Sequence, residues 1–320
     1  MSQVEWRWPV HLEPKNLTMD KKLCIVVCPT GALITRKQNP YQPYTPEEVA
    51  KEVIEAYKEG AYMAHLHIRN EKGLPNYTPE AMKKTLDIIF EKCPDIIAAP
   101  SISAAPKDPS QGLYEVETIK PWVEKLLEYG SKYMESTVVT PISYVSQRAT
   151  VLGAPIFVRR ATESNLKAEV EYLQSRGVKP EFMAHNFEAI ENIKEWLIKL
   201  GVLKEPYFIT LSQGMHHSAP TGPDPWGILY LITMKQMLPE NTIVGVSIGG
   251  RNWLPITTLA IMLGAVFIRV GKEDTMWLYP HKDSIMKTNA EAVKKIVTIA
   301  KELGRDIATP DEARKMLGIK

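Results

Sequence analysis

The sequence predicts an α/β fold, a single (β/α)8 barrel in which eight parallel strands are each followed by a helix. Three observations predict it. Short β-branched and apolar runs alternate with longer stretches of helical period, and eight such cycles can be counted. Glycines end six of the helical stretches, where a left-handed cap would precede the next strand. No change in composition separates the cycles, so a closed TIM barrel is favoured over a doubly wound open sheet.

The expected elements follow one another in regular order. The strands are expected at residues 23–28, 62–68, 96–101, 132–139, 181–185, 207–211, 242–248 and 265–270. The helices between them are expected at 47–59, 79–92, 116–129, 165–176, 189–200, 227–238, 256–263 and 290–303. Thr-Pro-x-Glu segments beginning at Thr45 and Thr309 predict helix starts, because the threonine caps, the proline fits the first turn and the glutamate completes a capping box.

The chain divides into a short arm and one domain. Residues 1–21 are expected to form an N-terminal arm, and residues 22–320 a catalytic barrel. Two loops, 100–112 and 141–162, are longer than simple connections, and a third loop, 214–225, is expected on the same face. All three follow the carboxyl ends of expected strands, the face on which barrel enzymes build their active sites. We therefore expect the functional site on this face.

The composition excludes several classes of protein. The 320 residues include 39 Lys+Arg and 37 Asp+Glu, a net charge of +2 with no basic cluster, so neither nucleic acid nor a membrane is an expected partner. The 3 cysteines include no Cys-x-x-Cys pair and indicate buried thiols in a reducing compartment. The N-terminal segment does not resemble a signal peptide, and no apolar run approaches the roughly 18 residues of a membrane span. A cytoplasmic protein is expected.

Two histidines lie at the end of the second expected strand. Side chains alternate along a strand, so His65 and His67 project from the same face, close enough for both imidazoles to bind one cation. The alternative is two histidines that only make local hydrogen bonds. Their position at a strand end favours a metal, and zinc comes first because imidazole suits it.

A third ligand is expected from another strand end, since a catalytic zinc usually has three protein ligands and an open position. The last strand is followed by Arg269-Val270-Gly271-Lys272-Glu273-Asp274, which places a guanidinium and two carboxylates on the same rim. In a closed barrel the second and last strands both flank the first, so Glu273 is a candidate ligand. The alternative is a solvated loop with an ion pair.

Four segments of the sequence carry a resemblance. They are His65-Leu66-His67-Ile68-Arg69, the Arg269–Asp274 segment, Gly249-Gly250-Arg251-Asn252-Trp253-Leu254-Pro255, and Leu303-Gly304-Arg305 followed by Ala308-Thr309-Pro310. Together they resemble the β-keto acid cleavage enzyme family over residues 22–317. The resemblance implies a zinc-dependent barrel enzyme, an acyl-CoA-forming C-acyltransferase. It would condense a β-keto acid with acetyl-CoA, release acetoacetate and a new acyl-CoA, and assemble as a homotetramer.

The resemblance also implies roles for individual residues. His65, His67 and Glu273 match the zinc ligands, and Arg269 and Asp274 match the catalytic pair. These roles fit enolate chemistry: a cation stabilises the charge that develops on the ketone oxygen, while Asp274, kept ionised by Arg269, removes the neighbouring proton.

Further residues are expected at the substrate pocket. Ser101 and Ser136 match small hydroxyl positions of the family, with capping or packing as the alternative. Leu33 and Met183 stand where the family's prototype has carboxylates. Without that counter-charge for an ammonium group, we expect a keto acid that lacks a basic amine.

Two weaker candidates lie in the loops. Gly214 is expected to shape the substrate or CoA entrance, although turn chemistry alone would also explain a glycine in a long loop. Arg251 follows the seventh strand, where barrels often bind phosphate or carboxylate, and a solvent-facing arginine is the alternative.

Two other classes of function compete with this interpretation. A zinc hydrolase with an amidohydrolase-like barrel would use a His-x-His pair, further histidines such as His185, His216 and His217, and an aspartate after strand eight. That architecture, however, carries the pair on its first strand. The other class is a non-catalytic barrel that binds metal and ligand, and it leaves Arg269 and Asp274 without a role.

Overall fold

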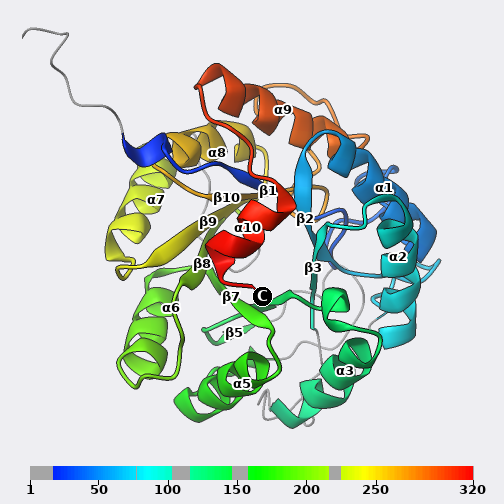
Figure 1. Ribbon diagram of the computed structural model, residues 1–320. Helices are drawn as coiled ribbons and strands as arrows, with labels where there is room; N and C mark the ends of the chain where they lie inside the picture. Colours follow the sequence, from blue (N-terminus) through cyan, green and yellow to red (C-terminus); the bar gives the residue numbers. More distant parts are fainter. Residues whose placement is uncertain (1–16, 77, 103–115, 146–157, 216–224, 320) are drawn as a thin grey trace, which may run out of the picture.

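The computed structural model describes residues 17–76, 78–102, 116–145, 158–215 and 225–319. Its centre is an eight-stranded sheet in the order β3-β2-β1-β10-β9-β8-β7-β4, surrounded by a ring of helices (Figure 1). The strands are β1 Cys24–Val27, β2 Ala61–Leu66, β3 Ile97–Pro100, β4 Ser136–Val139, β7 Lys179–Ala184, β8 Tyr207–Gln213, β9 Thr242–Ile248 and β10 Phe267–Val270. Each strand is parallel to its neighbours in the sheet.

The two end strands of the sheet also approach one another. Glu135 N donates to Ala98 O at 3.0 Å, and Thr137 Oγ1 donates to Pro100 O at 2.7 Å. These hydrogen bonds bring β3 and β4 together and nearly close the ring. The predicted (β/α)8 TIM barrel is therefore confirmed.

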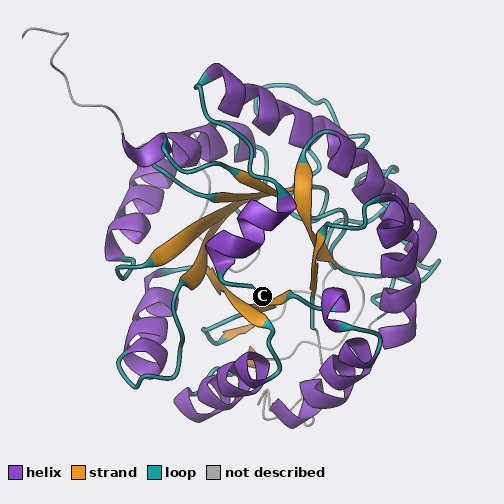
Figure 2. Cartoon of the chain, in the orientation of Figure 1, coloured by secondary structure: helices purple, strands orange, loops and turns teal. Residues whose placement is uncertain are grey.

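All helices except the last cover the outside of the barrel (Figure 2). The helices are α1 Pro46–Lys58, α2 Pro79–Lys92, α3 Val116–Glu128, α5 Glu163–Ser175, α6 Phe187–Asn192, α7 Pro225–Met237, α8 Trp253–Met262, α9 Asn289–Glu302 and α10 Pro310–Leu317. The predicted capping boxes at Thr45 and Thr309 are both present. The six glycines expected to end helices all have positive φ, between 68° and 133°. Each of these six helices therefore ends at the glycine expected there, although Gly130, with φ 133° and ψ 153°, is not the left-handed cap that was predicted.

Helix α10 closes the amino-terminal end of the barrel. It packs Ala313 and Leu317 against inward-facing residues of the strands, including Phe208 and Phe267, and Figure 1 shows it lying across the ring. Ala308 N donates to Leu23 O at 2.8 Å, just before β1 begins. With this end filled by apolar side chains, the carboxyl ends of the strands are left as the open face.

Several element bounds shift by a few residues, and three differences from the prediction go further. The helix expected over 189–200 is α6 followed by a π-helical turn, Ile193–Ile198, and it begins early because Asn186 caps it. The strand expected from residue 132 starts at Ser136, because Ser131–Tyr133 forms a 3-10 turn. The loop after β4 contains a short antiparallel ribbon, β5 Tyr144–Val145 with β6 Val158–Arg159, which was not expected.

The expected arm lies mostly outside the described residues, so its extent stays a prediction. Its described end, Leu17–Met19, is a 3-10 turn, in which Thr18 Oγ1 donates to Met262 O at 2.7 Å. Among the described residues, no helix has the length and apolarity needed to cross a membrane.

Candidate active site

The two histidines of β2 face each other at the open end of the barrel. His65 is the penultimate residue of β2 and His67 follows the strand directly, so alternation places both rings on the inner side. Their Nε2 atoms are 3.1 Å apart, and the two residues are only 2% and 8% exposed. Burial lowers the pKa of His65 to about 4, which keeps this imidazole neutral and able to bind a cation near pH 7.

Glu273 completes a triangle with these histidines. It follows β10, and its main-chain N–H donates to Cys28 O at the end of β1, at 3.1 Å. Glu273 Oε1 lies 3.2 Å from His67 Nε2, and Oε2 lies 3.5 Å from His65 Nε2. Burial on its own would raise the pKa of Glu273, but Arg269 and the two imidazoles hold that pKa well below its usual value.

The triangle fits a zinc ion. Donor atoms bound to one zinc at 2.0–2.1 Å with tetrahedral angles lie roughly 3.4 Å apart. The two imidazole Nε2 atoms here are 3.1 Å apart, and the carboxylate of Glu273 approaches His67 through Oε1 at 3.2 Å and His65 through its other oxygen, Oε2, at 3.5 Å. Glu273 Oε2 is buried and accepts no hydrogen bond from the described residues, so one carboxylate oxygen lacks the partner that a cation would provide. Two imidazoles and a carboxylate are a ligand set used by catalytic zinc sites, which keep a fourth position open.

A buried ion pair lies beside the triangle. Arg269, on β10 and 3% exposed, forms a bidentate pair with Asp274, with Nε to Oδ2 at 3.0 Å and Nη2 to Oδ1 at 2.9 Å. The same Nη2 lies 2.8 Å from Glu273 Oε1, so one guanidinium contacts both carboxylates. Burial and the nearby Glu273 raise the pKa of Asp274 above its usual value, although Arg269 opposes this. A carboxylate with a raised pKa is a stronger base.

Two further side chains hold Asp274, and the sequence analysis did not identify either. Ser247 Oγ on β9 donates to Asp274 Oδ2 at 2.9 Å, and Cys28 Sγ after β1 donates to the same oxygen at 3.2 Å. Both are inward-facing positions near strand ends, and this is the signal that would have found them. Burial is the largest reason that the pKa of Cys28 is raised well above its usual value, so the thiol stays protonated and donates.

Two glycines allow the loops to approach closely. A Cβ on Gly271, where φ is 156°, would lie 2.1 Å from Cys28 O. A Cβ on Gly31 would lie 2.4 Å from Glu273 Cγ. Arg69 Nε also donates to Gly31 O and thereby ties the end of β2 to the loop after β1. These contacts set the position of Glu273 between β1, β2 and β10.

A pocket opens above the triangle. Its described lining consists of Ala32, Leu33, Ile34, His67, Gly214, Met215, Glu273 and Asp274. The lining therefore combines an apolar segment, Ala32 to Ile34, with ionisable groups. Leu33 and Gly214, both expected at the substrate pocket, are part of this lining.

The structure does not bring every candidate into the pocket. Ser136 is wrong as a pocket residue: it starts β4 at the opposite end of the barrel, where its hydroxyl donates to Lys179 O at 2.8 Å. Arg251 is turned away, because it stacks 3.6 Å from the Trp277 ring centroid and pairs with Asp283 at 2.8 Å. Ser101 follows β3 next to β2, and Met183 is buried near the open end of β7.

Within the described part of the chain, the features expected for the hydrolase alternative do not come together. The His-x-His pair lies on the second strand of the barrel, not the first. His185 is buried after β7, but it belongs to neither of the metal-capable groups found among the described residues. His216 and His217 lie outside the described residues.

Comparisons with known proteins agree with this geometry. The profile of the family described as beta-keto acid cleavage enzyme matches residues 22–319. The 3-keto-5-aminohexanoate cleavage enzyme of Fusobacterium nucleatum is 34% identical over 304 residues, which cover 94% of this chain and 100% of that protein. The 3,5-dioxohexanoate:acetyl-CoA acetone transferase of Paraburkholderia graminis is 26% identical over 305 residues, which cover 94% of this chain and 96% of that protein.

A solved structure, that of apo ObcA, shares the fold. Its TM-score is 0.69 at 17% identity, and the match covers 88% of this chain and 66% of the ObcA chain. The family match spans nearly the whole barrel, including both strand ends that carry the site. The chain belongs to the beta-keto acid cleavage enzyme family and is an enzyme of the C-acyltransferase class.

Proposed function

We propose that this enzyme is zinc-dependent and condenses a β-keto acid with acetyl-CoA, giving acetoacetate and a new acyl-CoA. The observation that supports this most is the His65–His67–Glu273 triangle, which lies against the Arg269–Asp274 pair and contributes His67 and Glu273 to the lining of a pocket. His65, His67 and Glu273 would hold the zinc. A bound zinc supplies a Lewis acid for the ketone oxygen, where negative charge develops.

The remaining chemistry belongs to the chain's own residues. Asp274 takes the proton between the carboxylate and the ketone, and Arg269, with Ser247, holds its carboxylate in place. The resulting carbanion forms a bond to the thioester carbon of acetyl-CoA, and the CoA thiolate leaves. The thiolate then attacks the original ketone carbon, and the bond between that carbon and C2 breaks. Asp274 returns the proton to C2 of acetoacetate, so the reaction balances.

The apolar segment of the lining supports a substrate without a basic amine. Leu33 and its neighbours Ala32 and Ile34 face the pocket, and its described lining has no carboxylate apart from Glu273 and Asp274. Glu273 is assigned to the metal and Asp274 is already paired with Arg269. An ammonium group in this pocket would therefore lose its hydration without gaining a counter-charge. Relatives named for aminated keto acids, such as the Fusobacterium nucleatum enzyme, act on the other kind of substrate.

Metal analysis and a matched substrate pair test the proposal. We expect one zinc per chain by mass spectrometry, and acetoacetate formation that requires both acetyl-CoA and a β-keto acid. 3-Oxohexanoate and 5-amino-3-oxohexanoate differ only in the amino group, and we expect the first to have the higher kcat/KM. A protein that makes no acetoacetate from any β-keto acid, or that prefers the aminated acid, would contradict the reaction or the specificity respectively.

The assembly is proposed on the resemblance alone. We expect a homotetramer, which light scattering of the full-length protein would test.

A further inference from the structure

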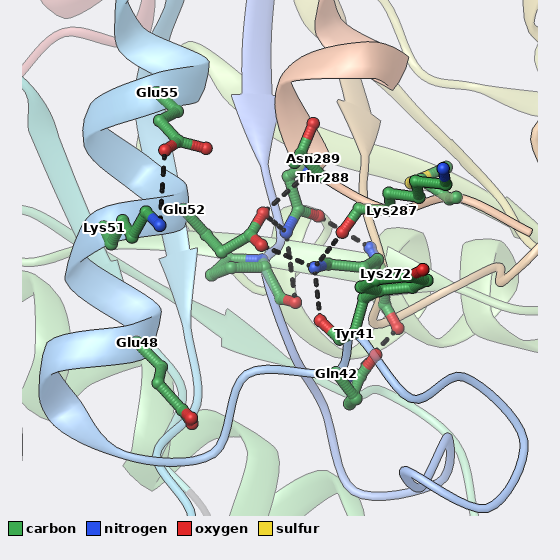
Figure 3. Close-up of polar contacts among 12 residues, drawn as sticks. Tyr41, Gln42, Glu48, Lys51, Glu52, Glu55, Lys272, Lys287, Thr288 and Asn289 are labelled. Carbon is green, nitrogen blue, oxygen red and sulfur yellow. Dashed lines mark hydrogen bonds and ion pairs between the residues drawn. The ribbon is translucent and has the colours of Figure 1, made fainter.

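Lys272, between Gly271 and Glu273, has a buried ammonium group outside the site. The side chain is 0% exposed, and its Nζ lies 2.6 Å from Glu52 Oε1 on α1. The same Nζ donates to Tyr41 O at 2.7 Å and Lys287 O at 3.0 Å. Figure 3 shows these contacts converging on Lys272 from α1 and from the segments on either side of it. All three donor directions of the ammonium are therefore used.

The main chain of Lys272 is held as well. Its N–H donates to Asn289 Oδ1 at 2.8 Å, and its carbonyl accepts from Gln42 Nε2 at 3.1 Å. Asn289, the first residue of α9, donates to Glu52 Oε2 from its main-chain N at 2.7 Å and from Nδ2 at 2.8 Å (Figure 3). Glu52 thus joins the ammonium of Lys272 to the residue that holds the main chain of Lys272.

Stability alone does not explain this cluster. A buried ion pair is often no more stabilising than apolar residues of similar volume, because both charges lose their hydration. What distinguishes Lys272 is its place in the chain: it immediately precedes Glu273 and is two residues before Asp274. The residues that bind Lys272 lie on α1, on α9 and in the loop after β1. These elements surround β1, the strand between β2 and β10.

We propose that Lys272, Glu52 and Asn289 form a positioning cluster that fixes the main chain carrying Glu273 and Asp274, so that the carboxylate of Glu273 is held against His65 and His67. This role rests on the metal site of the proposed function. The cluster touches neither substrate nor metal, and it acts only through the residues that follow it. Loss of the cluster lets Glu273 depart from the histidines while the barrel stays folded.

The test is zinc affinity, measured by chelator competition on the full-length protein, together with thermal unfolding. Lys272→Met keeps the length of the side chain and removes its charge. We expect the zinc dissociation constant to rise about tenfold or more, the range found when groups supporting a metal ligand are lost. Lys272→Arg, which keeps the cation, is expected to recover part of this loss.

Arg314→Met is the matched control. Arg314 forms another bidentate pair with a buried carboxylate, that of Glu135, at 2.6 and 2.9 Å, before β4 at the closed end of the barrel. We expect this variant to lose thermal stability while its zinc dissociation constant stays within twofold of wild type. If the zinc dissociation constant of Arg314→Met rose as much as that of Lys272→Met, the effect would be a general result of destabilisation, and the proposal would be overturned.

Gln42→Leu tests the same role without leaving a buried charge. It removes the hydrogen bonds to Lys272 O and to Thr30 Oγ1 at 3.0 Å. A weaker zinc affinity in this variant supports the positioning cluster. Unchanged zinc affinity in Gln42→Leu overturns the positioning role, whether or not Lys272→Met folds. Unchanged zinc affinity in a folded Lys272→Met overturns it as well. A wild-type protein that binds no zinc would instead overturn the metal site of the proposed function, and this role with it.

Discussion

Gly31→Ala gives the sharpest test of how Glu273 is placed. A Cβ at this position would lie 2.4 Å from Glu273 Cγ, 3.0 Å from Cδ and 3.2 Å from Oε1. The φ of Gly31 is outside the left-handed region, so alanine introduces no backbone strain there. Restoring an ordinary separation of roughly 3.4 Å requires a movement of about 1 Å. Metal-ligand distances tolerate about 0.2 Å. Glu273 cannot make this movement and still complete the triangle with His65 and His67.

We therefore expect Gly31→Ala to weaken zinc binding about 100-fold or more, with a parallel loss of turnover at limiting zinc. Chelator competition measures the affinity, and circular dichroism checks the fold. Gly201→Ala is the control: no atom lies within 4 Å of the added Cβ, but φ is +68°, so it should cost about 1 kcal/mol of stability and leave zinc binding unchanged. Wild-type zinc affinity in Gly31→Ala would refute the steric reasoning.

Three other predictions address the base, the pocket wall and the closed end of the barrel. Asp274→Asn should lower kcat by about 10²–10⁴-fold and keep one zinc per chain, because it removes the base and none of the three ligands; full activity would exclude Asp274 as the base. Leu33→Glu should raise kcat/KM for 5-amino-3-oxohexanoate relative to 3-oxohexanoate by about tenfold, since it adds a counter-charge to the pocket, and an unchanged ratio would count against the specificity argument. Burial lowers the pKa of Lys179 from its ordinary 10.5 to about 8, so between these values the unfolded chain binds more protons than the folded one and stability rises with pH. In thermal unfolding, wild type should therefore gain stability relative to Lys179→Met from pH 8 to 10.5, and a constant difference would contradict the burial effect.

Hydrophobic periodicity and the residues that start and end helices were enough to predict the barrel. Apolar runs marked the strands because a parallel sheet is buried on both faces, and glycines and Thr-Pro segments marked the helix ends. The His65–His67–Glu273 triangle could also be predicted from the sequence. Alternation along β2 pairs His65 with His67, and closure of the barrel brings β10 to the other side of β1.

The errors arose where the local sequence pattern does not determine how far along a strand a residue lies or whether its side chain is buried. Ser136 was assigned to the pocket because it matches a hydroxyl position of the family in the expected strand 132–139, but a 3-10 turn delays the start of β4, so that Ser136 lies at the closed end. Glu181 illustrates the same limit. It is an acid in a strand, and only the folded chain shows that it is buried, with Thr210 Oγ1 donating to it at 2.6 Å. Contacts between residues far apart in sequence decide such cases.

The spacing of the Arg269–Asp274 segment can now be given a physical reason. Arg269 points into the barrel from β10, and Gly271 lets the chain pass Cys28 O at a distance that a side chain would forbid. The turn that follows sends Lys272 outward to Glu52, Glu273 toward the histidines and Asp274 back to Arg269. Inserting or deleting one residue here would exchange these directions, leaving a charge unpaired outside the barrel and removing a carboxylate from the triangle. The site therefore depends on the order of these residues as much as on their chemistry, and one arginine contacts both carboxylates because they are consecutive in a turn that begins one residue after β10 ends.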